Sequence, residues 1–135
     1  MRIELCGLDF LVVNTSRPSN LLCSWGFLYK KDAQWIADRC AEHPGVPKIL
    51  VNHYPMIEDH PILRTRHRLF GEKPVRQMLE NGTLDLSLCG HVHKPYCRVD
   101  ATGRGENCAG SVTRNGSMVE ITFDNNVFSY KTINF

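Results

Sequence analysis

Short apolar runs and amphipathic stretches alternate along the first two thirds of the chain. Polar and apolar residues alternate in Arg2–Leu5, which predicts a half-exposed strand, and the apolar run Leu8–Val13 predicts a buried one. Two further runs, Lys48–Asn52 and Asp85–Cys89, are typical of strands that are buried on both faces. These four segments predict the core of a sheet.

Two stretches between these strands have helical periodicity. In residues 31–42, Trp35, Ile36 and Cys40 fall on one side of a helix. Residues 72–80 form the second expected helix, and Asn81-Gly82 provides its stop signal. The order strand, helix, strand, helix, strand predicts an α/β arrangement with right-handed crossovers.

After His93 the pattern changes to strands only. The expected strands are Tyr96–Val99, Cys108–Arg114, Met118–Phe123 and Val127–Ile133, with turns at Asn115-Gly116 and Asn125-Asn126. The chain is therefore expected to end in an antiparallel meander. Residues 16–30 and 56–71 show no period and are predicted to be loops.

Composition excludes several classes of protein. With 135 residues, 42% of them hydrophobic, the chain is long enough for one core. The 16 basic and 14 acidic residues nearly balance, which does not argue for nucleic acid or an anionic membrane as partner. No apolar run has the length of a membrane span, and no secretion signal is recognisable, so we expect a cytoplasmic protein. The six cysteines form no Cys-x-x-Cys pair and are expected to be mostly reduced core residues.

Histidines follow two of the predicted buried strands. His53 comes directly after the strand at 48–52, and Gly90-His91-Val92-His93 follows the strand at 85–89. Ligands of open α/β sheets gather at the carboxyl ends of strands, and neutral imidazole is the commonest protein metal ligand. A lone histidine is usually hydrogen-bonded or solvated, but three at two strand ends favour a metal site.

These motifs resemble those of the calcineurin-like metallophosphoesterases. The segments Val51-Asn52-His53-Tyr54-Pro55 and Cys89-Gly90-His91-Val92-His93 resemble the last two motifs of that family. The helical segment Asp32-Ala33-Gln34-Trp35-Ile36 resembles its glutamine–tryptophan helix, and Ala109-Gly110-Ser111 resembles the small-residue strand start after the second motif. The resemblance implies a four-layer αββα sandwich with mixed sheets. It also implies a binuclear site for two divalent or trivalent metal ions, such as Mn, Fe or Zn. Carried over by motif, His53 and His91 would bind one ion and His93 the other.

The resemblance also implies an activity, hydrolysis of phosphodiesters or phosphomonoesters, with a phosphate-ester substrate. Three earlier motifs of the family, Asp-x-His, Gly-Asp and Gly-Asn-His, do not occur in this sequence. We therefore expect residues 1–135 to form a single partial domain, the C-terminal portion of a phosphoesterase domain. We expect such a fragment to be inactive alone and to require the missing N-terminal half as its partner. Without that half, uncovered strand edges would lead it to self-associate.

The long loop after His53 is rich in charged residues. It contains Glu58-Asp59-His60 and the arginines Arg64, Arg66 and Arg68. As a lid, the arginines would attract a phosphate-ester substrate, while a solvated charged loop is an equal alternative. Two alternatives stay open for the whole chain: a non-catalytic α/β interaction module, and a simple zinc-binding domain without hydrolysis.

Overall fold

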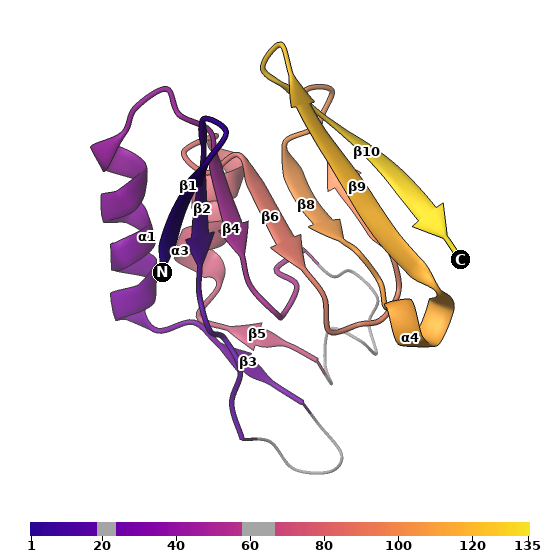
Figure 1. Ribbon diagram of the computed structural model, residues 1–135. Helices are drawn as coiled ribbons and strands as arrows, with labels where there is room; N and C mark the ends of the chain where they lie inside the picture. The colour runs from indigo at the N-terminus through magenta and orange to yellow at the C-terminus, as the bar shows by residue number, and fades with distance from the viewer. Residues whose placement is uncertain (19–23, 58–66) are drawn as a thin grey trace.

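A six-stranded mixed sheet organises the chain (Figure 1). The computed structural model describes residues 1–18, 24–57 and 67–135. The strand order across the sheet is β1 (Arg2–Leu5), β2 (Leu8–Val12), β4 (Lys48–Val51), β6 (Leu86–Cys89), β8 (Gly105–Cys108) and β7 (Tyr96–Val99). The four central strands are parallel, and β1 and β7 pair antiparallel at the two sides. The predicted α/β class is therefore confirmed.

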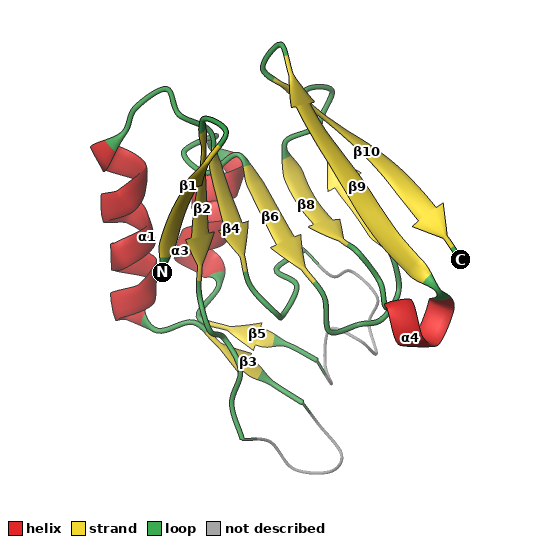
Figure 2. Ribbon diagram, viewed as in Figure 1, coloured by secondary structure: helices red, strands yellow, loops and turns green. Residues whose placement is uncertain are grey.

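Two helices cover one face of this sheet (Figure 2). Helix α1 (Lys30–Glu42) and helix α3 (Lys73–Glu80) direct apolar side chains such as Ile36 and Val75 onto the sheet residue Leu50, and all three are fully buried. Both helices end within one residue of their predicted bounds, because periodicity and stop signals are local features.

A separate hairpin covers part of the opposite face. Strands β9 (Ser117–Asp124) and β10 (Val127–Asn134) pair with each other and with no other strand of the described residues. Phe128 of β10 packs on Ile49 and Leu86 of the main sheet. The turn at Asn125-Asn126 has φ angles of 48° and 64°, as a two-residue hairpin turn of this handedness requires. Figure 1 shows the hairpin, in orange and yellow, on the side where β8 lies.

The prediction for residues 108–116 is wrong. Strand β8 ends at Cys108, and a short helix α4 (Val112–Asn115) follows where a strand and a turn were expected. The Ser111 hydroxyl accepts a hydrogen bond from the Arg114 backbone N–H (3.3 Å), which caps this helix. Strand β8 also runs parallel to β6, so the chain end is a mixed sheet edge plus one hairpin rather than a meander.

The two predicted loops contain one short strand each. Strands β3 (Gly26–Phe27) and β5 (Leu69–Phe70) pair in parallel across 43 positions of sequence. At Gly26 a β-carbon would lie only 2.4 Å from the ring of Tyr54, so this strand position requires glycine. A strand of two residues is too short to show an alternating pattern in the sequence, so β3 and β5 were not predicted.

The cysteines are divided between core and surface. Cys40, Cys89 and Cys108 are buried thiols, as predicted, whereas Cys6 and Cys97 are exposed, and Cys23 lies outside the described residues. Within residues 1–18, 24–57 and 67–135, no helix is long and apolar enough to cross a bilayer.

Candidate metal centre

Three histidines meet at the carboxyl-terminal edge of the main sheet. His53 follows β4 and His91 follows β6, and these two strands are parallel neighbours. The Gly90 backbone N–H donates a hydrogen bond to the His53 carbonyl oxygen (3.1 Å), which ties the two strand ends together. As a result, His91 Nδ1 lies 3.0 Å from His53 Nε2, and His91 Nε2 lies 2.8 Å from His67 Nδ1.

His67 is the member of this cluster that the sequence interpretation did not single out. It lies just before β5, in the charged segment predicted to be a lid. No strand ends at His67 and no motif includes it, so only the folded chain brings its ring to His91. The remaining signal in the sequence was its place in the loop that follows His53.

His93, two positions after His91, is exposed. His93 is close enough to His53 and His91 for a positive charge on its ring to lower the pKa of both. Among the described residues, His53, His91 and His93 do not all place a nitrogen within 4.8 Å of one another. This spacing does not place the three rings around one ion.

Burial and nearby histidines lower the pKa of His53 and of His91. Burial is the main cause that lowers the pKa of His91 to about 4, with further contributions from His53, His67 and His93. Burial also lowers the pKa of His53, and His93 adds to the effect. A neutral imidazole has one N–H and one nitrogen lone pair, so His53 and His91 can each offer one ligand nitrogen to a metal at neutral pH.

The geometry of His53 and His91 fits two ligands of one ion. Tetrahedral zinc with Zn–N distances of about 2.0–2.1 Å separates two ligand nitrogens by roughly 3.3 Å, close to the 3.0 Å that separates His91 Nδ1 from His53 Nε2. His67 contacts the opposite nitrogen of His91, so it does not share that ion in this arrangement.

Tyr54 holds the His91 ring from the side of the core. Tyr54 is 3% exposed, and its ring centroid lies 4.1 Å from that of His91. The Tyr54 hydroxyl shares a hydrogen bond with the Ser24 hydroxyl (2.8 Å). A metal ligand held by neighbouring groups loses less freedom when it binds, so Tyr54 is part of the support of the site.

A buried carboxylate fixes the chain after His53. Glu106 on β8 is fully buried and accepts hydrogen bonds from the backbone N–H groups of Met56 (2.8 Å) and Ile57 (2.9 Å). The Tyr96 hydroxyl also donates to it (2.8 Å). Burial raises the pKa of Glu106, and these hydrogen bonds partly oppose that rise. The polar sequence around Glu106, Arg104-Gly105-Glu106-Asn107, does not identify its distant partners.

The Gly90-His91-Val92-His93 segment adopts an unusual backbone. His91 has φ 65° and His93 has φ 54°, both in the left-handed region that residues with a side chain rarely adopt. Such residues cost about 1–3 kcal/mol each and cluster at functional sites. The left-handed conformation at His91 and His93 therefore marks this short segment as a candidate functional site.

The predicted arginine lid is only partly described. Arg64 and Arg66 lie outside the described residues, and their role in a lid stays a prediction. Arg68 is exposed, and its guanidinium lies 4.9 Å from the centre of the Phe70 ring.

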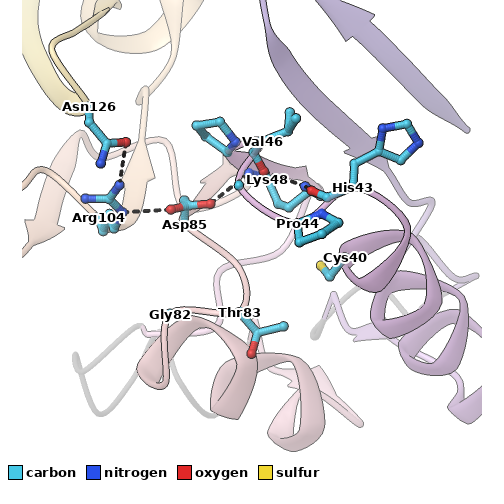
Figure 3. A pocket seen from close by; sticks show the side chains of 12 residues that line it. Cys40, His43, Pro44, Val46, Lys48, Gly82, Thr83, Asp85, Arg104 and Asn126 are labelled. Carbon is cyan, nitrogen blue, oxygen red and sulfur yellow. Dashed lines mark hydrogen bonds and ion pairs between the residues drawn. The ribbon is translucent and has the colours of Figure 1, made fainter.

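A cavity of about 320 Å³ lies at the opposite, amino-terminal edge of the sheet (Figure 3). Asp85 in its wall accepts hydrogen bonds from Arg104 Nε (2.7 Å) and from the Lys48 backbone N–H (2.8 Å). Lys48 Nζ donates to the carbonyl oxygens of His43 (2.7 Å) and Val46. These charged groups are already used in internal contacts, so the cavity is a weaker candidate site than the histidine cluster.

A carboxylate cluster near that edge is likewise occupied by internal contacts. Ligand atoms of Glu4, Asp9 and His43 lie within 4.8 Å of one another. However, Arg2 Nη2 lies 2.9 Å from the buried Asp9 carboxylate and also contacts Glu4. A cation would have to displace this guanidinium, so we assign the cluster to an ion-pair network.

Comparison with known proteins places the chain in a family. The model of the calcineurin-like phosphoesterase family matches residues 5–95, which is about two thirds of the chain. The match ends just after His93, so it spans β2, both helices and the whole histidine cluster. A comparison with curated proteins gave no significant match. Members of the matched family are metal-dependent phosphoesterases that typically bind two metal ions. The chain belongs to the calcineurin-like phosphoesterase family.

Proposed function

We propose that this chain supplies the histidine half of a binuclear metal centre that hydrolyses phosphodiesters or phosphomonoesters. The 3.0 Å approach of His91 Nδ1 to His53 Nε2, in a chain of this family, is the observation that carries the proposal. His53 and His91 hold one ion and His93 holds the other, and the ions are Mn, Fe or Zn.

The chain's own residues position this half-site. When bound, two such ions polarise a phosphoryl oxygen and make water a nucleophile near neutral pH. Tyr54 and His67 orient the His91 ring through contacts at its face and at Nε2. Glu106 fixes the segment directly after His53. Preorganisation of this kind lets the ligands act without rearrangement.

The carboxylate ligands come, in this proposal, from an N-terminal segment with the Asp-x-His, Gly-Asp and Gly-Asn-His motifs. That segment also completes the four-layer αββα sandwich. Two features support this: the hairpin β9–β10 packs on the sheet face opposite the helices, and it pairs with no further strand among the described residues. Without its partner, the chain self-associates through such strand edges.

The first experiment measures metal binding by the 135-residue chain. Manganese and zinc affinities are compared between the chain and its H53A, H91A and H43A variants by titration calorimetry. We expect weak binding that H53A and H91A each reduce at least tenfold, while H43A, at the opposite edge, changes nothing. Equal affinity in all four proteins would contradict the metal centre.

The second experiment measures hydrolysis of bis-p-nitrophenyl phosphate with manganese. We expect no turnover by the chain alone and turnover after an N-terminal half with the three missing motifs is added. Turnover by the purified chain alone would show that no second half is needed. Metal binding without turnover in either mixture would favour the interaction module.

The simple zinc domain is not supported by the geometry. His53 and His67 contact opposite nitrogens of the His91 ring. Within the described ranges, no three histidines gather their nitrogens within 4.8 Å. A three-histidine zinc site would therefore require the rings to rearrange.

A further inference from the structure

The outer face of the β3–β5 ribbon carries a row of exposed aromatic side chains. Alternate residues of an extended strand point to opposite faces. Gly26 and Leu28 point inward and are buried, whereas Trp25, Phe27 and Tyr29 are 44%, 39% and 38% exposed. A continuous exposed apolar surface of this kind commonly marks a binding site.

Strand β5 extends the same face. The parallel register pairs Phe27 with Phe70, so their side chains lie on the same side of the ribbon. The Trp25 ring packs edge-on against Phe70 with centroids 5.9 Å apart, and Phe27 lies 4.8 Å from Tyr29. The aromatic surface, as named below, consists of Trp25, Phe27, Tyr29, Phe70, Arg17 and Arg68.

The two arginines give this surface a positive charge. The guanidinium of Arg17 lies 4.1 Å from the ring centre of Tyr29, and that of Arg68 lies 4.9 Å from that of Phe70. Both side chains are exposed, and neither is ion-paired to a described carboxylate. Aromatic rings interleaved with arginine suit a ligand that combines a flat ring with an anionic group.

The aromatic surface adjoins the histidine cluster. His67, which contacts His91, directly precedes Arg68. The three residue steps from His67 to Phe70 span at most about 10 Å. The inner side of the ribbon is equally close, because Gly26 packs on the Tyr54 ring and that ring packs on His91. One small molecule can therefore reach both the histidines and the aromatic surface.

We propose that the aromatic surface binds the flat ring of the phosphoester substrate, so that the substrate is a nucleotide-like phosphoester. The nucleobase stacks on Trp25 and Phe70, the sugar spans the start of β5, and the phosphate lies at the histidines. The assignment as a substrate rests on the proposed function, whereas the ring contact is measurable by binding alone.

The test uses Trp25 as its own probe. The chain has two tryptophans, so the W35F variant leaves Trp25 as the single fluorophore. AMP and ribose 5-phosphate, which differ by the base, are titrated with and without manganese. We expect AMP to quench Trp25 and to bind at least roughly fivefold tighter than ribose 5-phosphate. Equal dissociation constants for the two ligands would overturn the proposal.

Matched variants locate the contact, with affinities measured by calorimetry in the chain that keeps Trp35. W25L should abolish the preference for AMP, W25F should keep most of it, and F135L, at an exposed site elsewhere, should not alter it. An unchanged preference in W25L would overturn the proposal. A second result would also overturn it: sedimentation shows that W25L no longer self-associates, while the parent chain binds AMP and ribose 5-phosphate with equal affinity. The aromatic surface would then be a contact between protein chains.

Failure of this inference can be distinguished from failure of the proposed function. Manganese binding that depends on His53 and His91, without an AMP preference, leaves the metal centre and removes the base site. An AMP preference that depends on Trp25, without manganese binding, leaves a base-binding surface and removes the hydrolase assignment.

Discussion

At the amino-terminal edge of the main sheet, Lys48 and Asp85 contact charged and polar groups that satisfy them. At the carboxyl-terminal edge, His91 contacts both His53 and His67. Because the charged groups of Lys48 and Asp85 are already bonded within the protein, few of their atoms remain available to bind a ligand. The histidines instead form hydrogen bonds with each other, and a cation bound by His53 and His91 would replace the hydrogen bond between them. Metal-ligand side chains that contact each other, rather than a cavity, therefore distinguish the candidate site.

The strongest way to break the amino-terminal edge is K48M. Lys48 is 2% exposed, and its Nζ donates to the carbonyl oxygens of His43 and Val46. Its Nζ also lies 3.7 Å from the buried Asp9 carboxylate, which keeps Arg2 as a second partner. We expect the free energy of unfolding in urea to fall by about 2–3 kcal/mol, because the variant loses two hydrogen bonds from a charged donor. K30M, at an exposed lysine, should change it by no more than about 0.5 kcal/mol. Equal losses in both variants would show that the Lys48 contacts contribute nothing.

Glu106 gives the carboxyl-terminal edge a dependence on pH. Because burial raises its pKa, folded Glu106 keeps its proton to higher pH than unfolded Glu106. The free energy of unfolding therefore falls as pH rises from about 4.3 through the pKa of folded Glu106. The total fall is about 1.4 kcal/mol for each unit by which folding raises that pKa. E106Q cannot ionise and should lack this component when both proteins are unfolded in urea at several pH values. If the unfolding free energies of E106Q and of the parent chain changed with pH in the same way, Glu106 would not be the source of this pH dependence.

H67A tests the support of the metal centre. His67 contacts Nε2 of His91, the nitrogen that faces away from His53. Loss of such an orienting partner typically weakens metal binding about 10–100-fold, and we expect H67A to do so in manganese titrations. The urea midpoint should change little, since His67 is only half-buried. Unchanged affinity would remove His67 from the site.

Y54F is the mildest change at this edge. It removes the hydroxyl that shares a hydrogen bond with Ser24 and keeps the ring that packs on His91. We expect a loss of about 1 kcal/mol in unfolding free energy and no change in metal affinity. A large fall in metal affinity would mean that the hydroxyl, rather than the ring, positions His91.

Local patterns predicted much of the fold and part of the site. The parallel strands that carry His53 and His91 were predicted from their apolar runs, and adjacency of β4 and β6 brings the two rings together. The segment at 108–116 was mispredicted, because the Ser111 cap and the turn at Gly110 (φ 79°) override its strand-like residues. Whether the three predicted histidines bind metal stays a prediction.

The sequence by itself determined the helix bounds, the central strands and the Gly90-His91-Val92-His93 segment, because each depends on residues close together in the chain. Only the tertiary structure decided that His67 joins His91, that Glu106 holds Met56 and Ile57, and that β3 pairs with β5. These contacts join positions 24 to 50 residues apart, and their partners are chosen by packing of the whole sheet rather than by local periodicity. The partners that complete the candidate site therefore became visible only when the chain was folded.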